Sequence, residues 1–233
     1  RSSDLHADIN FFISNEDREY AIAAFKLNAA NCYTITYGSE VLQPASLQDR
    51  NNARKQLSAQ YQFSAADNIL LFNGTLNYGP NLDALKTILD KINPILKLNP
   101  QFRYKIFICG KGLPDSLNEL KNYTSENIIY AGFVDDISVY FKAADIFINP
   151  VSDGGGIKTK LVEALGYGVS AVSYANGAIG VPTSVTGNKL LIVPENDNIQ
   201  FANAIMNINR DAITPPEFFD YFYWGNIAKK ALH

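Results

Sequence analysis

The stretch Gly154-Gly-Gly-Ile-Lys-Thr-Lys-Leu-Val-Glu-Ala164 places three glycines directly before an apolar run typical of a helix. The segment Asp145-Ile-Phe-Ile-Asn-Pro150 that precedes it has the pattern of a buried strand. The amides of Gly154, Gly155 and Gly156, together with the positive end of a helix, favour an anion. In open α/β sheets, ligands bind beyond the carboxyl ends of the strands. The sequence therefore predicts a diphosphate at this strand–loop–helix junction.

The run after the glycines carries two lysines and one glutamate. On a helix, Thr159, Lys160 and Glu163 share one face, so Lys160 is expected beside the anion and Glu163 about one turn further along. A carboxylate in that place suits paired hydroxyls, as on ribose. Lys158 can reach the site only from the loop. The alternatives are a flexible glycine turn and an i,i+3 ion pair on a solvated surface.

Three other strand ends carry small or polar residues. Gly74 and Thr75 follow one apolar run, and Gly110 follows another. The backbone of Phe133 and Val134, after a third run, could meet the edge of a nucleobase. Each of these could also be an ordinary turn between a strand and a helix. Their joint position at one sheet edge indicates a shared crevice.

Strand-like and helix-like runs alternate along almost the whole chain. This alternation predicts an α/β fold, a Rossmann-like parallel sheet with helices on both faces. The expected strands are 9–13, 32–37, 69–73, 104–109, 128–131, 146–149, 169–174 and 190–193. The expected helices are 16–28, 47–61, 80–98, 115–123, 136–143, 157–167 and 199–208.

A break in the apolar patterning near 38–48 divides the chain. We expect residues 1–40 to be the remnant βαβ unit of an N-terminal Rossmann-like domain with its linker. Residues 41–208 are expected to form a complete Rossmann-like domain. Residues 209–233 form a strongly aromatic segment and a helix, whose partner is either this domain or the half that we expect to be missing.

Composition limits the possible functions. The 233 residues carry a net charge of −3, so no basic field draws the chain to nucleic acid or to anionic lipid. No apolar run is long enough to span a membrane and no signal peptide is evident, which favours the cytoplasm. Cys32 and Cys109 are expected to be buried free thiols. With two histidines, His6 and His233, and no Asp-x-Asp motif, no metal or cofactor is expected.

The order and spacing of these segments resemble the donor-binding domain of group 1 glycosyltransferases, which have the GT-B fold of two Rossmann-like halves. The run 154–168 is similar to that family's glycine-rich loop and following helix. The aromatic tail ending in Trp224 is similar to the terminal helix that crosses back to the partner domain. The matching segments are 71–81, 106–112, 130–134, 144–150, 154–168 and 177–180.

The resemblance implies roles for particular residues. It places Lys160 near the donor diphosphate and Glu163 on the ribose hydroxyls. It puts the backbone of 154–156 at the sugar–phosphate end and that of 74–75 across the pyrophosphate. Segment 8–14 resembles the last strand of the N-terminal half, so most of that half, with the acceptor site, is expected to lie outside this chain.

The chain departs from the family pattern in two places. Many members have a second glutamate eight positions before the ribose glutamate, and that position here is Gly155. Many also carry Arg and Lys in the loop that matches 74–81, which here has no basic residue. More of the diphosphate charge is therefore left to Lys158 and Lys160.

The resemblance implies a retaining, metal-independent hexosyltransferase that moves a sugar from a nucleoside diphosphate to an acceptor. Lys160 and Lys158 would stabilise the charge developing on the leaving diphosphate. We expect the fragment alone to bind donor weakly and to be nearly inactive, in the cytoplasm or at a membrane through its acceptor or missing half. The alternatives are a non-catalytic nucleotide-binding module and a nucleotide-sugar epimerase of the same architecture.

Overall fold

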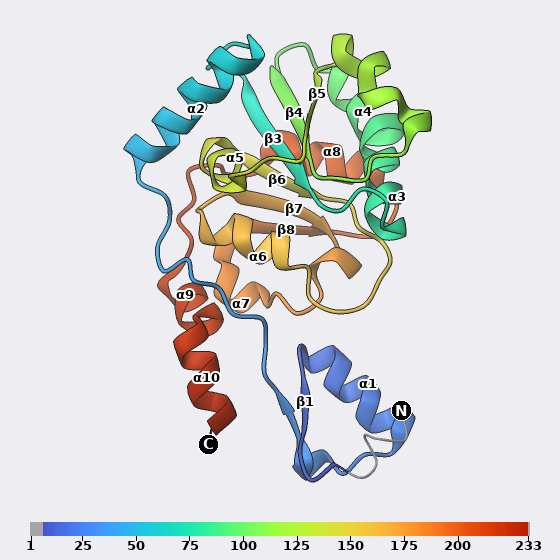
Figure 1. Ribbon diagram of the computed structural model, residues 1–233, viewed down its shortest axis with the longest axis vertical. Helices are drawn as coiled ribbons and strands as arrows, with labels where there is room; N and C mark the ends of the chain where they lie inside the picture. The colour runs from blue at the N-terminus through green and yellow to red at the C-terminus, as the bar shows by residue number, and fades with distance from the viewer. Residues whose placement is uncertain (1–6, 233) are drawn as a thin grey trace.

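The computed structural model describes residues 7–232, so His6 and His233 lie outside the described part of the chain. Its main body is a six-stranded parallel sheet with the order β5-β4-β3-β6-β7-β8 (Figure 1). This arrangement confirms the prediction of a Rossmann-like sheet. The six strands are β3 (Asn68–Asn73), β4 (Tyr104–Cys109), β5 (Ile128–Gly132), β6 (Ile146–Asn149), β7 (Ser170–Tyr174) and β8 (Leu190–Val193).

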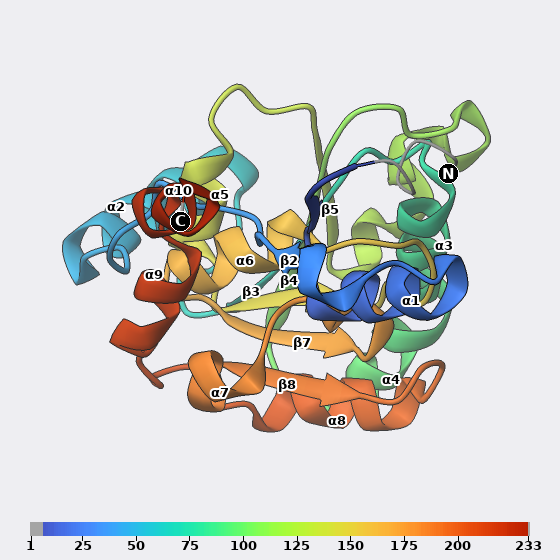
Figure 2. The ribbon, with the colours of Figure 1, turned by 90° about the horizontal axis from the view of Figure 1, so that it is seen from below.

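Helices cover both faces of this sheet (Figure 2). Because alternate side chains of a strand point to opposite faces, Leu70 and Phe72 pack with one helical layer, and Ile69 and Leu71 pack with the other. Burial on both sides explains why these strands are nearly continuous apolar runs. The first layer holds α3 (Gly79–Thr87), η3 (Ile88–Ile92), α4 (Asn93–Lys97) and α8 (Asn198–Asn207); the second holds α2 (Leu47–Tyr61), α5 (Ile137–Ala143), α6 (Thr159–Gly166) and α9 (Pro216–Phe222).

The single helix predicted over 80–98 is divided in the structure. It runs as α3, a π-helical turn η3 and α4, with the amide of Asn93 donating to the carbonyl of Ile88. Pro94 explains the interruption, because it has no N–H and its ring clashes with the preceding turn of an α-helix. Shorter helical segments complete the main body: η4 (Asp115–Glu126), η5 (Asn176–Ala178), α7 (Thr183–Thr186) and η6 (Gly187–Lys189).

A small unit lies beside the main body (Figure 1). It consists of the parallel pair β1 (Asn10–Phe12) and β2 (Cys32–Thr34) with α1 (Asn15–Phe25) and the turn η2 (Ala29–Asn31). Ser14 caps α1 by accepting a hydrogen bond from the amide of Asp17. Phe11 and Tyr33 remain about half exposed, at 54% and 48%. This unit therefore buries only part of its apolar surface.

Part of the aromatic tail packs on the main body, whereas Tyr223 and Trp224 remain 39% and 48% exposed. Phe218 and Phe222 of α9 are both 1% exposed within the core layer of α6. The last helix, α10 (Trp224–Leu232), begins where the tail crosses the linker, and the amide of Ser39 donates to the carbonyl of Phe222 at 2.6 Å. The linker and the tail thus meet at one point.

Candidate functional site

The candidate site lies where the sheet order reverses. The chain forms β3, β4 and β5 outward in one direction and then returns to place β6 on the other side of β3. Loops that leave neighbouring strands in opposite directions open a crevice at their carboxyl ends. Gly74 follows β3, and the glycine loop 154–156 follows β6. The topology therefore brings the two strongest sequence candidates to the same crevice.

A cavity of about 310 Å³ occupies this crevice. It is lined from the β3 side by Gly74 and Thr75 and from the β6 side by Gly155, Lys158 and Lys160. Three further polar residues line the cavity and were not predicted as site residues: Tyr78, Asn81 and Asn149. Their only signal in the sequence was their position near the end of a strand.

The glycine loop has a conformation that requires glycine at two positions. Gly154 and Gly156 have φ values of 88° and 72°, in the left-handed region that disfavours residues with a Cβ. Within residues 7–232, the amides of Gly155, Gly156 and Ile157 donate to no protein acceptor. In the first turn of α6 (Thr159–Gly166), the amide of Leu161 donates to the carbonyl of Lys158 at 2.9 Å, whereas those of Thr159 and Lys160 have no acceptor among these residues. Together these groups form an unpaired set of donors next to the cavity.

Lys158 holds the loop in this shape. Its ammonium donates to the carbonyls of Gly154, Gly155 and Gly156 at 2.7, 3.2 and 3.0 Å. The helix begins one residue later, at Thr159, so Lys158 approaches the cavity from the loop, as its position in the sequence suggested. Burial lowers the pKa of this ammonium, an effect that nearby acidic charges partly oppose. Lys158 is therefore an organiser of the loop whose charge lies at the cavity wall.

Lys160 and Glu163 form an ion pair on one face of α6. The ammonium lies 3.1 and 3.0 Å from the two carboxylate oxygens. Both side chains are partly exposed, at 41% and 20%. Tyr37 of the linker also donates to Glu163 Oε1, at 3.3 Å. The i,i+3 pair considered from the sequence is thus present, and it lies beside the cavity.

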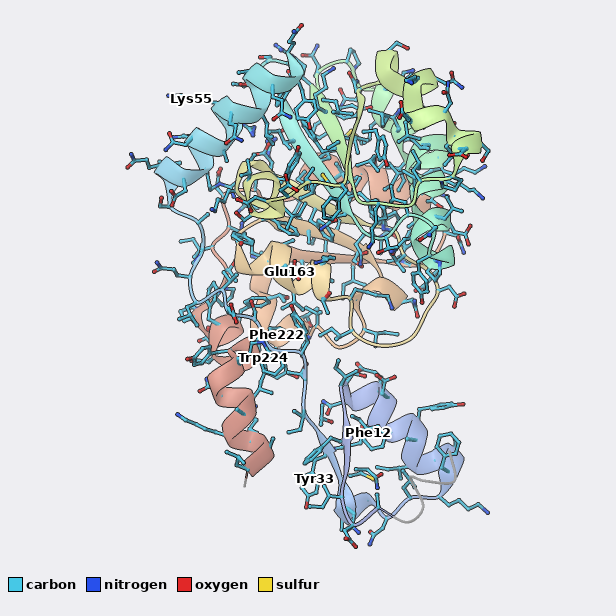
Figure 3. All side chains as sticks on the ribbon, in the orientation of Figure 1. Phe12, Tyr33, Lys55, Glu163, Phe222 and Trp224 are labelled. Carbon is cyan, nitrogen blue, oxygen red and sulfur yellow. The ribbon has the colours of Figure 1, made fainter. Side chains whose placement is uncertain are left out.

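Glu163 faces a second cavity, of about 390 Å³, on the other side of the ion pair. Aromatic side chains from four segments line it: Tyr37 of the linker, Phe141 of α5, Tyr167 after α6 and Trp224 of α10. Figure 3 shows Glu163 on α6, with Phe222 and Trp224 of the tail below it. The carboxylate therefore stands between a polar crevice and an aromatic one.

The remaining sequence candidates lie along the same sheet edge but do not line the polar cavity. Gly110 packs against the backbone of Gly74, where an added Cβ would lie 1.8 Å from the Gly74 carbonyl oxygen. Its amide donates to the carbonyl of Gly132 at 2.7 Å, so the ends of β3, β4 and β5 are tied together. Phe133, 71% exposed, and Val134 follow β5. The structure thus divides the candidates between the crevice and its outer rim.

Other classes of site are poorly represented in the described residues. No group of three His, Cys, Asp or Glu side chains among residues 7–232 is arranged to hold a metal ion. None of the helices in that range is both long and apolar enough to cross a membrane. Cys32 and Cys109 are buried free thiols, as expected, and burial raises the pKa of Cys109 well above its usual range.

Comparison with known proteins connects this geometry to one family. The family model of the group 1 glycosyl transferases matches residues 67–211. An uncharacterised 44.6 kDa protein in the cps region of Klebsiella pneumoniae is 31% identical over 149 residues, which cover 61% of this chain and 37% of that protein. The chain therefore spans well under two thirds of this relative.

Several solved structures have a similar fold. A sucrose-phosphate synthase from Thermosynechococcus elongatus superposes with a TM-score of 0.72 at 19% identity, covering 99% of this chain and 58% of that one. A glycosyltransferase from Rickettsia africae also gives 0.72, at 14% identity and coverages of 98% and 62%. The Anabaena protein Alr3699/HepE in complex with UDP-glucose gives 0.72 at 17% identity, with coverages of 99% and 64%. At these identities the likeness concerns the fold.

Proposed function

This chain belongs to the group 1 glycosyl transferases, and we propose that it binds the nucleoside-diphosphate sugar of a sugar-transfer reaction. The observation that supports this most is the crevice between Gly74 and the glycine loop. It combines unpaired amides, the N-terminus of α6 and two lysines at the carboxyl edge of a parallel sheet. This combination suits a diphosphate, because amides and ammonium groups stabilise its charge without a metal ion.

Lys160 and Glu163 are proposed to separate when the donor binds. Lys160 would turn to the diphosphate oxygens, and Glu163 would accept hydrogen bonds from the ribose hydroxyls. A partly exposed ion pair contributes little to stability, so exchanging it for ligand contacts costs little. Lys158 would keep the loop shaped for the phosphate while adding its charge. In the reaction, both lysines would stabilise the leaving diphosphate.

The acceptor is proposed to bind on a further N-terminal lobe. The chain covers 58–64% of the similar solved structures. Apolar side chains of the small β1–β2 unit are exposed in a way that suits packing against additional strands; Ile9, Phe11 and Tyr33 are 55%, 54% and 48% exposed. Without such a lobe the chain would bind donor but transfer little sugar.

We further propose a reducing, cytoplasmic location, consistent with the two free thiols.

A second candidate is a nucleotide-binding module without catalysis. Gly155 occupies the place of a sugar-facing glutamate, and the 74–81 loop has no basic residue. Donor turnover separates the candidates: a module binds the nucleotide sugar without consuming it. An epimerase would convert the donor with no acceptor present.

Titration of the 233-residue chain with UDP, GDP and ADP tests the proposal by heat release or thermal shift. Ligand at about 100-fold over Kd adds about 2.7 kcal/mol of stability. Glu163→Gln should reduce the preference for UDP over its 2′-deoxy form, while Lys55→Gln, exposed on α2, serves as the control. No response to any of the three nucleotides at millimolar concentration would contradict donor binding.

A further inference from the structure

A third, larger cavity opens at the opposite edge of the sheet. It has a volume of about 690 Å³ and lies where β6, β7 and β8 begin, between α2 and the segment after α8. The donor crevice lies at the carboxyl ends of the strands, so the two cavities are separated by the length of the sheet. The charged side chains of its lining are Arg50, Arg54, Asp145, Lys189, Arg210 and Asp211.

The charges of this lining do not balance. Four cationic and two acidic side chains face the cavity, which leaves an excess of two positive charges in a chain whose net charge is −3. Arg54 forms an ion pair with Asp145, one of the two acidic residues, and its Nη2 lies 2.7 Å from Asp145 Oδ2. It also donates to the carbonyls of Ala65 and Asp67, so it serves as a clamp between α2 and the sheet. The excess positive charge is therefore carried by Arg50, Lys189 and Arg210.

Lys189 supplies a buried positive charge. The residue is 1% exposed, and its ammonium donates to the carbonyl of Gly168, the hydroxyl of Ser170 and the carbonyl of Arg210 at 2.7, 3.2 and 3.3 Å. All three acceptors are neutral. Burial, followed by the nearby charge of Arg50, lowers the pKa of Lys189 to about 8. Buried charges in proteins are usually paired, so this ammonium favours an anion nearby.

Arg50 and Arg210 bring guanidinium donors to the same cavity as Lys189. Arg50 Nη2 donates to the carbonyl of Ala144 at 2.8 Å and lies 4.0 Å from Asp145 Oδ1. Its Nη1 is buried and meets no acceptor among residues 7–232. A buried donor without a partner is destabilising, and an oxyanion would supply one. Arg210 is exposed at the mouth of the same cavity and is held to Asn68 through Nη1.

We propose that this basic cavity is a phosphate-binding site, separate from the donor crevice. A phosphomonoester carries close to two negative charges at neutral pH, which matches the excess of the lining. The planar guanidinium groups of Arg50 and Arg210 suit phosphate oxygens, and Lys189 adds its charge from beneath. Two exposed apolar side chains, Leu47 and Ile213, line the same cavity at 75% and 80% exposure. They favour a phosphate carried on an apolar group.

The test is binding of inorganic phosphate and of hexyl phosphate to the 233-residue chain at fixed ionic strength, in phosphate-free buffer at pH 7. We expect saturable binding, at least threefold tighter for hexyl phosphate. Arg50→Gln and Arg210→Gln should each weaken it about tenfold. Lys160→Met, in the donor crevice, and Lys55→Gln, elsewhere on α2, should leave it unchanged. UDP should not compete.

A vesicle arm identifies the source of the phosphate. Sedimentation with phosphatidic acid vesicles, lost in Arg50→Gln, would assign a lipid headgroup; binding of hexyl phosphate without sedimentation would assign a soluble phosphate compound. Arg50→Lys keeps the charge without the planar guanidinium and should retain more affinity than Arg50→Gln, which separates loss of binding from loss of folding. Absence of saturable binding in the wild type, or binding that UDP or Lys160→Met abolishes, would overturn the proposal.

Discussion

The hydroxyl of Tyr37 donates a 3.3 Å hydrogen bond to Oε1 of Glu163 and so joins the linker to α6. Burial, followed by the negative charge of Glu163, raises the pKa of this tyrosine. The hydroxyl therefore stays protonated at neutral pH and keeps Glu163 as its acceptor. A residue 126 positions away in sequence thus contributes to the orientation of a candidate ribose ligand.

Tyr37→Phe removes this hydrogen bond while keeping the ring beside Trp224. We expect a loss of about 1 kcal/mol or less in unfolding free energy, since one partly exposed hydrogen bond is removed. The preference for UDP over 2′-deoxy-UDP should fall, because Glu163 is less fixed. Calorimetric titration with both nucleotides measures the preference. An unchanged ratio would show that Tyr37 does not orient the carboxylate of Glu163.

Lys160→Met should weaken binding of the diphosphate more than binding of the nucleoside. The change removes one full charge from the crevice and keeps the apolar length of the side chain. We expect about a tenfold increase in Kd for UDP, equivalent to about 1.4 kcal/mol, and little change for uridine. The exposed Lys55→Met is the matched control. Equal losses of affinity for UDP and for uridine would contradict contact between Lys160 and the diphosphate.

Gly155→Glu tests whether the crevice can accept the missing carboxylate. A Cβ at Gly155 would meet nothing within 4 Å, and its φ is not in the left-handed region. The fold should tolerate the change within about 0.5 kcal/mol. Relative to UDP, a UDP-sugar should then bind more tightly. By contrast, Gly156→Glu should destabilise the loop by about 1 kcal/mol or more, because φ there is 72°.

Gly38→Ala should disturb the contact between linker and tail. An added Cβ would lie 2.2 Å from the ring of Trp224, so the ring or the linker must move. We expect a loss of about 1–3 kcal/mol, as for other overpacked contacts. Trp224 is the only tryptophan of the chain, so its fluorescence reports the displacement directly. Identical emission spectra and denaturation midpoints for both proteins would contradict this packing.

The lowered pKa of Lys189 predicts that the unfolding free energy depends on pH. Its pKa in the folded state is about 8, below the ordinary value of 10.5, so between these values the unfolded chain binds more protons. The unfolding free energy should therefore rise with pH in this window. Relative to Lys189→Met, the wild type should gain about 1–2 kcal/mol from pH 8 to 10. Urea denaturation at several pH values measures the difference, and parallel curves would contradict it.

Much of the architecture was readable from the sequence because the core strands are buried on both faces. The run Tyr104–Cys109 was predicted with the bounds that the structure has, and so was the helix Leu47–Tyr61. The π-helical turn was missed, although Pro94 gave a signal for it. The start of α6 was placed early, at residue 157, because Lys158 continues the loop by bonding to its carbonyls.

The site could be predicted only where its residues are close in sequence. The glycine loop and the i,i+3 pair fall within one short stretch. Tyr37 reaches Glu163 through the fold, and periodicity carries no information about such a contact. The same holds for the basic cavity, since Arg50, Lys189 and Arg210 come from segments far apart in sequence. Strand order, which determines both cavities, depends on packing between distant elements.

The crossing of linker and tail has a mechanical consequence. Ser39 donates to the carbonyl of Phe222 and accepts from the amide of Trp224, so the outgoing and returning chains are fastened side by side. A double connection of this kind permits tilting about one axis and resists twisting, since a twist would break both bonds. Helix α10 continues beyond this point and lines a crevice with Asn15 and Thr34. A tilt at this connection would therefore change the width of that crevice.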